Sequence, residues 1–168
     1  MTVTEREEWL SRVMEEYRTC LMRMSYLYLG DFALAEDAVQ ETFINAYYHL
    51  DSFRGESSEK TWLIRIAINT CISISRKPWM RLLKHTISLD SVDKAGITDR
   101  YRDDTVINAV CNLPNKYKQA ILLYYYQEMS IPEIADALSI PVPTAQTRLT
   151  RGREKLRTVL KEWYFDEE

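Results

Sequence analysis

The stretch that decides the fold lies near the end of the chain and reads SIPEIADALSIPVPTAQTRLTRGREKLRTVL, residues 130–160. Ser130 is followed three residues later by Glu133, with Pro132 between them, and this capping box predicts the start of a short helix. After Pro141, apolar residues recur every three or four positions as far as Trp163, which predicts a second, longer helix. A short helix, a tight turn and a longer helix form the pattern of a helix-turn-helix unit.

Helical periodicity also fills the N-terminal part of the chain. A first helix is expected over about residues 5–29, and Gly30 marks its end. Asp31 caps a second helix that reaches about Leu50. After a loop of Ser, Gly and Asp residues, Ser57 or Ser58 caps a third helix that reaches about Arg76 and is apolar on most of its circumference.

The helix-turn-helix unit is preceded by two more expected helices, over about residues 105–112 and 114–127. Residues 79–103 separate them from the N-terminal helices and are polar, with Pro78 in front, so a linker with some helix around 79–84 is expected there. The predicted fold class is therefore all-α: two small helical domains, 1–78 and 104–168, joined by a flexible linker, the C-terminal one a helix-turn-helix.

Charge is distributed unevenly along the chain, although the net charge is only −3. Residues 1–60 hold 6 basic and 12 acidic residues, whereas residues 61–89 hold 5 basic residues and no acidic one. A second basic island covers residues 146–161, where six Lys and Arg residues accompany Glu154. An acidic front and two basic islands indicate separate surfaces for separate partners, although each island can also be a solvated helix face.

No pattern in the chain points to catalysis, a cofactor or a membrane. His49 and His85 lie far apart without carboxylates or cysteines at metal-ligand spacing, and the three cysteines form no CxxC pair. The N-terminus lacks the apolar core of a signal peptide, and the most apolar run, residues 62–74, is too short to span a bilayer. We expect a cytoplasmic protein that is not an enzyme, holds no metal or cofactor and does not insert into a membrane.

The last helix carries the clearest functional pattern. With Val142, Ala145, Leu149 and Leu156 packed inward, its other side suits the major groove of DNA, because Arg pairs with guanine, Gln with adenine and Thr with a thymine methyl or a phosphate. The residues expected to contact DNA here are Thr144, Gln146, Thr147, Arg148, Thr150, Arg151, Arg153 and Lys155.

The third helix is a second candidate for nucleic-acid binding. Arg65, Asn69, Arg76 and Lys77 occur at helical spacing on an otherwise apolar element that begins near Trp62. Aromatic side chains beside basic ones suit the stacking of exposed bases and the tracking of a strand. The alternative is that Trp62 belongs to the core, and aromatic content alone favours that alternative.

Several runs together resemble the extracytoplasmic-function sigma factors of bacterial RNA polymerase. In the N-terminal part these runs are AEDAVQETF at 35–43, FRGESS at 53–58 and TWLIRIAIN at 61–69. In the C-terminal part they are Leu113-Pro114, SIPEIA at 130–135 and RLTRGREKL at 148–156. Two independent sets of motifs in the expected order make this resemblance far more specific than a lone helix-turn-helix.

The resemblance implies a role for each part of the chain. The second helix is expected to dock on core RNA polymerase through Asp37, Gln40, Glu41, Phe43 and Asn45. The following loop and third helix are expected to hold the melted downstream promoter element, with the first melted base flipped into a loop pocket. The residues implied are Phe53, Arg54, Gly55, Glu56, Ser57, Ser58, Trp62, Arg65, Asn69, Arg76 and Lys77.

The resemblance further implies that the last helix reads the upstream promoter element as duplex, and that an anti-sigma factor, often membrane-anchored in this family, restrains the protein. Three positions depart from the family pattern. Gln146 stands where a basic residue is frequent, Pro143 where glycine is frequent, and Ser73 where Asp or Asn is common. Base preference is therefore the part of the function that the resemblance fixes least.

Two other classes of protein remain open at this stage. A polymerase-independent helix-turn-helix repressor would bind a palindromic operator as a dimer. It leaves the block from Phe53 to Asn69 unexplained. An adaptor whose basic helix binds an acidic protein would show no sequence-specific binding to DNA.

Overall fold

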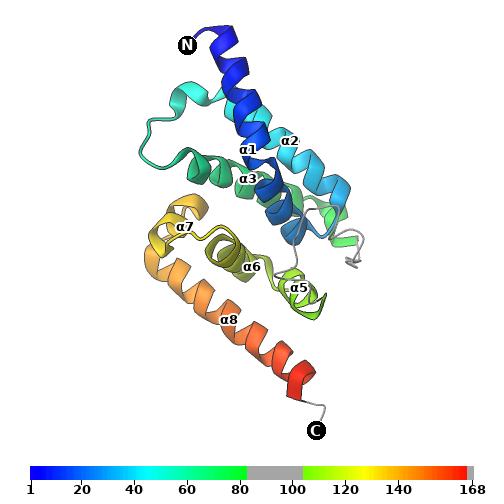
Figure 1. Ribbon diagram of the computed structural model, residues 1–168. Coiled ribbons are helices and arrows are strands. Elements are labelled where there is room, and N and C mark those ends of the chain that lie inside the picture. Colours follow the sequence, from blue (N-terminus) through cyan, green and yellow to red (C-terminus); the bar gives the residue numbers. More distant parts are fainter. Residues whose placement is uncertain (83–103, 166–168) are drawn as a thin grey trace.

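The protein is described by a computed structural model that places residues 1–82 and 104–165. Every regular element in these two ranges is helical, so the predicted all-α fold class is confirmed (Figure 1). The predicted linker lies mostly outside the described residues. Its first part forms the short 3-10 helix η2 (Pro78–Leu82), where partial helix was expected.

The N-terminal half consists of α1 (Val3–Leu29), α2 (Phe32–Tyr48), the 3-10 turn η1 (Leu50–Ser52) and α3 (Glu59–Ser75). The ends of these helices follow from local side chains. Gly30, with φ +71°, closes α1 in the left-handed conformation. The side chain of Asp31 accepts a hydrogen bond from the N–H of Leu34, and Ser58 accepts one from Thr61. The three helices pack on one another.

The C-terminal half consists of α5 (Asp104–Cys111), α6 (Asn115–Ile121), the π-helical turn η4 (Leu122–Tyr126), α7 (Ile131–Leu138) and α8 (Val142–Phe165). The capping box predicted at Ser130 is present. The turn of the helix-turn-helix has no glycine, and Ser139 itself adopts the left-handed conformation with φ +53°. The helix expected over 114–127 differs in its last turn, where the N–H of Gln127 reaches back to the carbonyl of Leu122.

The two halves pack against each other through α1 and α3, and one buried apolar cluster runs through both. At the α1 side, the buried Lys118 donates hydrogen bonds to the carbonyls of Tyr28 (2.8 Å) and Cys111 (2.9 Å). The carbonyl of Tyr28 belongs to the last turn of α1, where carbonyls lack helical partners and favour a cation. Burial lowers the pKa of Lys118.

On the other side of the interface, α7 lies below α3, and α8 runs along the lower edge of the molecule (Figure 1). Two domains are expected from the sequence, but the packing between them is not visible in it. Within residues 1–82 and 104–165, no helix combines the length and apolar character needed to cross a membrane.

Candidate nucleic-acid and protein interfaces

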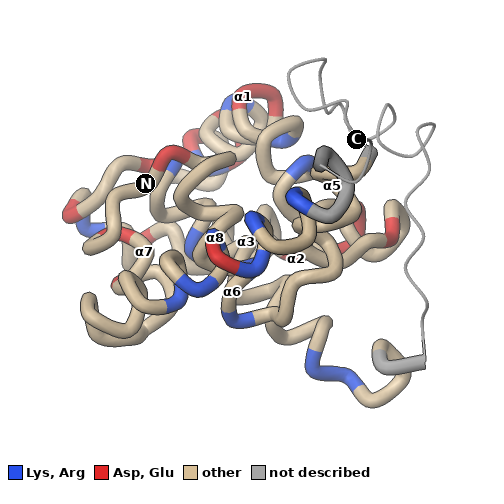
Figure 2. The backbone as a smooth tube through the Cα atoms, turned by 90° about the horizontal axis from the view of Figure 1, so that it is seen from below, with Lys and Arg blue, Asp and Glu red and all other residues tan. Residues whose placement is uncertain are grey.

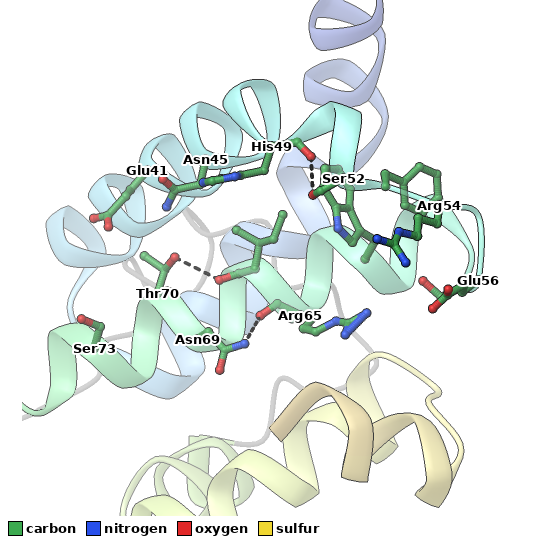
Figure 3. A pocket seen from close by; sticks show the side chains of 14 residues that line it. Glu41, Asn45, His49, Ser52, Arg54, Glu56, Arg65, Asn69, Thr70 and Ser73 are labelled. Atoms are coloured by element: carbon green, nitrogen blue, oxygen red, sulfur yellow. Dashed lines mark hydrogen bonds between the residues drawn. The ribbon is translucent and has the colours of Figure 1, made fainter. Parts of the chain in front are cut away.

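A pocket of about 850 Å³ opens between α2, the loop of residues 53–58 and α3 (Figure 3). Seven of the residues predicted to hold the downstream element line this α2–α3 pocket: Phe53, Arg54, Glu56, Ser57, Trp62, Arg65 and Asn69. Gly55 turns the loop with φ +71°, and Ser58 caps α3. Arg76 and Lys77 are exposed just beyond α3, outside the pocket.

Aromatic rings form the wall of the pocket near the loop. The ring centroids of Phe53 and Trp62 lie 5.0 Å apart, and those of Trp62 and Trp9 of α1 lie 6.3 Å apart. Trp62 is 8% exposed, so it is a core residue whose remaining surface faces the pocket. The two interpretations of Trp62 are therefore compatible, because one ring can pack in the core and present an edge to a ligand.

The start of α3 is held firmly against α1. Both oxygens of the Glu59 carboxylate accept hydrogen bonds from the Arg12 guanidinium, at 2.9 and 2.8 Å. The indole N–H of Trp9 donates to the same carboxylate at 2.7 Å. Hydrogen bonding to Arg12 lowers the pKa of Glu59. This cluster fixes the end of α3 from which Trp62 and Arg65 project.

Arg65 and Asn69 already have partners in the C-terminal half. The Arg65 guanidinium lies 3.2 Å from the Asp136 carboxylate of α7. The Asn69 amide donates to the carbonyl of Arg65 at 2.9 Å and to the carbonyl of Ala137 at 3.4 Å. The helix α7 thus contacts the same rim of the pocket that was predicted to bind promoter DNA.

The residues predicted to dock on polymerase do not all line one cavity. Glu41 and Asn45 line the α2–α3 pocket, whereas Gln40 and Phe43 line a groove of about 680 Å³ between α1 and α2. Asp37 is exposed and lines neither. Phe43 is 3% exposed, so it lies beneath the α1–α2 groove and offers little surface to a partner.

The α1–α2 groove also contains residues that sequence reasoning missed. Met14, Ile44 and Tyr48 line it and are large apolar residues at 40%, 55% and 73% exposure. Ile44 and Tyr48 are four positions apart on α2 and lie off its buried stripe, which is the pattern that could have revealed them. Exposed apolar side chains lining a groove are typical of a protein-binding surface.

The inner side of α8 mostly follows the prediction. Ala145 and Leu149 are buried and Leu156 is half-buried, but Val142 is 45% exposed because it begins the helix beyond the reach of the core. Close packing also requires Gly152, since a Cβ there would lie 2.9 Å from Cγ1 of Ile121.

The outer side of α8 divides into two flanks. Gln146, Thr147, Thr150, Arg151 and Lys155 are exposed, and Thr144, Arg148 and Arg153 are half-buried. On one flank, a basic cleft of about 380 Å³ is lined by Lys116, Tyr117, Pro143, Thr144, Thr147, Arg148 and Arg151. Figure 2 shows Lys and Arg recurring along α8. Lys116 was missed because it belongs to α6 and joins the cleft only through folding.

Arg153 lies on the other flank of α8 and already has packing partners. Its Nε donates to the hydroxyl of Tyr125 at 2.6 Å, and its guanidinium lies 5.0 Å from the ring centroid of Tyr124. These contacts tie α8 to η4. A structural role for Arg153 thus accompanies the predicted contact with DNA.

Comparisons with known proteins agree with this arrangement. Residues 13–81 match the family model of sigma-70 region 2, and residues 103–156 match sigma-70 region 4. The ECF RNA polymerase sigma factor SigW of Bacillus subtilis (strain 168) is 32% identical over 164 residues, covering 89% of this chain and 88% of the relative. The ECF RNA polymerase sigma-E factor of Escherichia coli (strain K12) is 31% identical, covering 86% and 81%.

Two solved structures share the fold. The sigma factor RpoE of Bartonella quintana, in complex with the anti-sigma factor NepR, has a TM-score of 0.72 at 23% identity and covers 89% of this chain and 97% of its own. CnrH, in complex with the cytosolic domain of CnrY, has a TM-score of 0.66 at 23% identity and covers 92% and 89%. With both family regions and close sequence relatives in agreement, this chain belongs to the extracytoplasmic-function sigma factors, which direct RNA polymerase to promoters.

Proposed function

We propose that the chain meets its partners through three separate surfaces. The α2–α3 pocket takes a base of the melted downstream promoter element, the outer side of α8 reads the upstream element as duplex, and the α1–α2 groove docks on core RNA polymerase. With RNA polymerase and promoter DNA as partners, we infer that the protein acts in the cytoplasm. The observation that carries the proposal is that seven residues chosen from sequence for one role line a single pocket.

The chemistry of the pocket suits an extruded base. A flipped base must recover the stacking and hydrogen bonds that it loses on leaving the duplex. Phe53 and Trp62 offer aromatic surface, and Asn69 offers an amide with both a donor and an acceptor. Arg54 and Arg65 supply positive charge near the strand, and Arg76 and Lys77 extend it beyond α3.

The outer side of α8 suits duplex DNA for a different reason. Thr147 and Arg151 are exposed there, and both line the basic cleft. Arg148 and Lys116 add positive charge to one flank, where phosphates of the upstream element would lie. We assign base reading to Thr147 and Arg151, and positioning on the backbone to Lys116 and Arg148.

Docking on polymerase is assigned to the α1–α2 groove, where exposed apolar residues lie beside acidic ones. Ile44 and Tyr48 supply apolar area, and Glu36 and the nearby Asp37 supply charge. Gln40 lines the same groove. A partner with a basic and apolar helix would complement this surface.

We also propose the division into domains 1–78 and 104–168 with a linker between them, and regulation by an anti-sigma factor. The two structural relatives were solved in complexes with NepR and with CnrY, the first an anti-sigma factor by name. The exposed apolar groove of this chain supports a protein partner of that kind. Such a partner would compete with polymerase for the groove.

The deciding experiment is run-off transcription with purified core polymerase on a library of promoter templates. The chain should direct initiation from a defined subset of templates, and core polymerase alone should not. Specific binding to a palindromic site by a polymerase-free dimer, with no initiation on any template, would support the repressor alternative and refute the proposal.

A further inference from the structure

Tyr117 is a buried tyrosine of α6 that also lines the basic cleft beside α8. Only 7% of the residue is exposed. Its Cβ lies 3.4 Å from the place that a Cβ on Gly152 would take, so α6 and α8 come close together at the base of the ring. The packing of these two helices therefore leaves the ring little freedom to move.

Three cationic side chains surround this tyrosine. The Nζ atoms of Lys116 and Lys155 lie 5.0 and 5.8 Å from the centroid of its ring. Its hydroxyl oxygen accepts hydrogen bonds from the side chains of Arg151 and Lys116. Burial raises the pKa of Tyr117, but these hydrogen bonds and the positive charges together outweigh burial and lower it. A phenylalanine could fill the same space, so the hydroxyl has a use beyond packing.

Arg151 depends on this hydroxyl for its orientation. Its side chain is exposed on α8, and no carboxylate in the described ranges forms an ion pair with it. An unrestrained arginine samples many rotamers, and this freedom must be given up when the side chain binds a ligand. A hydrogen bond to a hydroxyl that packing already holds in place restricts the rotamers in advance.

We propose that Tyr117 is a positioning residue for Arg151, so that a buried tyrosine sets the sequence preference of α8 without touching DNA. This inference rests on the proposed function, in which Arg151 reads a base of the upstream element. It adds a residue of α6 to the determinants of base preference.

The chemistry of arginine explains why its orientation matters for base preference. Arginine recognises guanine through two parallel N–H donors, and a rotated guanidinium loses one of these two hydrogen bonds. The guanidinium carries five N–H donors, so the hydrogen bond that Arg151 gives to Tyr117 leaves others for a base. Phosphates have better access to Lys116, which is exposed, than to Tyr117.

A second pair of Arg and Tyr on the other flank of α8 offers a comparison. There, Nε of Arg153 donates to the hydroxyl of Tyr125 at 2.6 Å, and the guanidinium packs on the ring of Tyr124. Arg153 is half-buried, whereas Arg151 is exposed. The Arg153 pair therefore fastens α8 to η4, whereas the Tyr117 pair orients a guanidinium that is open to a ligand.

The test measures binding of upstream duplexes to the full chain in complex with core polymerase, by fluorescence anisotropy. Arg151→Ala first identifies the base pair whose preference Arg151 sets. At that base pair, wild type should bind its preferred base about tenfold more tightly than the others, as expected for one bidentate contact. Tyr117→Phe keeps the ring and removes only the hydroxyl, so this ratio should fall to about threefold. In the Arg151→Ala background, Tyr117→Phe should not change the ratio further.

Tyr125→Phe is the matched control, because it removes the hydroxyl that accepts from Arg153 and keeps the ring. The ratio should stay at its wild-type value in this variant. Thermal denaturation should give nearly the same midpoint for Tyr117→Phe as for wild type, which separates a change in base preference from loss of folding.

Three results would overturn the inference and leave the proposed function standing. An unchanged ratio in Tyr117→Phe would show that the hydroxyl does not position Arg151. An equal loss of affinity on every duplex would make Tyr117 itself a phosphate contact. An equal fall of the ratio in Tyr125→Phe would show that any loosening of α8 relaxes the preference. If wild type prefers no base, or Arg151→Ala relaxes no preference, the base-reading role of Arg151 fails, and this inference fails with it.

Discussion

The α2–α3 pocket and the outer side of α8 are both proposed to bind promoter DNA, yet they are not equally accessible to it. Thr147 and Arg151 are exposed on α8. In the pocket, Arg65 and Asn69 already contact Asp136 and the carbonyl of Ala137 in α7. Duplex DNA can approach α8 directly, whereas a melted strand must displace the contacts that α7 makes.

The two contact regions between the halves differ in strength. The side chains of Arg65 and Asp136 are 37% and 65% exposed, so their ion pair contributes roughly 0–1 kcal/mol to the free energy of unfolding. Against α1, Lys118 and Cys111 are buried in the shared core, where breaking hydrogen bonds leaves polar groups without partners. From this difference we expect the α7 side to separate first and the α1 side to act as the hinge.

The largest expected effect is on the rate of thiol labelling, which tests whether the contact with α1 stays closed. Cys71 lies within the N-terminal half, and Cys111 donates to the carbonyl of Leu27 at the contact with α1. Burial raises the pKa of both thiols from 9.0 to about 12. At pH 8 each should therefore react about a thousandfold more slowly with iodoacetamide than in the unfolded chain, because only the thiolate reacts.

Adding core polymerase and a promoter should leave labelling slow at both Cys71 and Cys111, because the contact with α1 stays closed as the hinge. Faster labelling at Cys111 alone would contradict a hinge at α1, and equal acceleration at both cysteines would indicate general unfolding. The same pKa values set a pH effect. The folded chain keeps these protons after the unfolded chain has lost them, so the free energy of unfolding should fall as the pH rises from 9 toward 12. Urea denaturation across that range measures the slope.

Gly152→Leu should cause the next largest effect, on the α8 side of the comparison. A Cβ at Gly152 meets Cγ1 of Ile121 at 2.9 Å and Cβ of Tyr117 at 3.4 Å, so a larger side chain must push α8 away from α6. The expected loss is about 3 kcal/mol in the free energy of unfolding, the upper end of the usual range for overpacking. Upstream duplex binding should weaken with it.

Gly55→Ala is the matched control in the pocket loop. No atom lies within 4 Å of a Cβ there, but φ is +71°, so only backbone strain of about 1 kcal/mol is expected. Urea denaturation of Gly152→Leu and Gly55→Ala compares the loss of stability caused by a steric clash with the loss caused by backbone strain. Equal losses would show that the packing of α8 on α6 is looser than described.

The parts of this molecule that could be predicted from sequence depend on nearby residues. Gly30, Asp31, Ser58 and Ser130 end or begin helices through contacts three or four residues away, and such patterns are visible in the sequence. The family motifs placed Phe53 and Asn69 at one site, and both line the pocket.

The parts that could not be predicted depend on distant residues. Lys118 binds the carbonyl of Tyr28, 90 positions away, and Asn69 contacts Ala137, 68 positions away. No periodicity encodes such contacts. The position of Asn45 in the lining of the α2–α3 pocket was missed for a related reason, since a helix-periodic motif does not show which neighbour each side of the helix faces.

Arg151→Ala tests the outer side of α8, and its effect should lie between those of Gly152→Leu and Asp136→Asn. If Arg151 reads a base, upstream duplex binding should weaken by about 1–3 kcal/mol and sequence preference should relax at one position. Fluorescence anisotropy with a set of single-base variants of the duplex measures both. Initiation rates on forks that differ only in the melted base should keep their ranking. A uniform loss over all duplexes would instead make Arg151 a phosphate contact.

Asp136→Asn should have the smallest effect and tests the comparison most directly. It removes the anion that faces Arg65 while keeping a side chain of similar size, so the free energy of unfolding should fall by less than about 1 kcal/mol. With Arg65 released, complexes with core polymerase should bind forked templates up to about fivefold more tightly, and this gain should shrink as salt screens the original ion pair.

Binding of upstream duplex serves as the internal control, because losing a negative charge near DNA could raise every affinity. If α7 competes with the melted strand, Asp136→Asn strengthens binding of the fork and leaves binding of the duplex unchanged. Glu128→Gln, which removes an exposed carboxylate elsewhere in the C-terminal half, should leave both unchanged. Equal gains on fork and duplex would mean that Asp136 acts only through general electrostatics, and the two DNA surfaces would then be equally free.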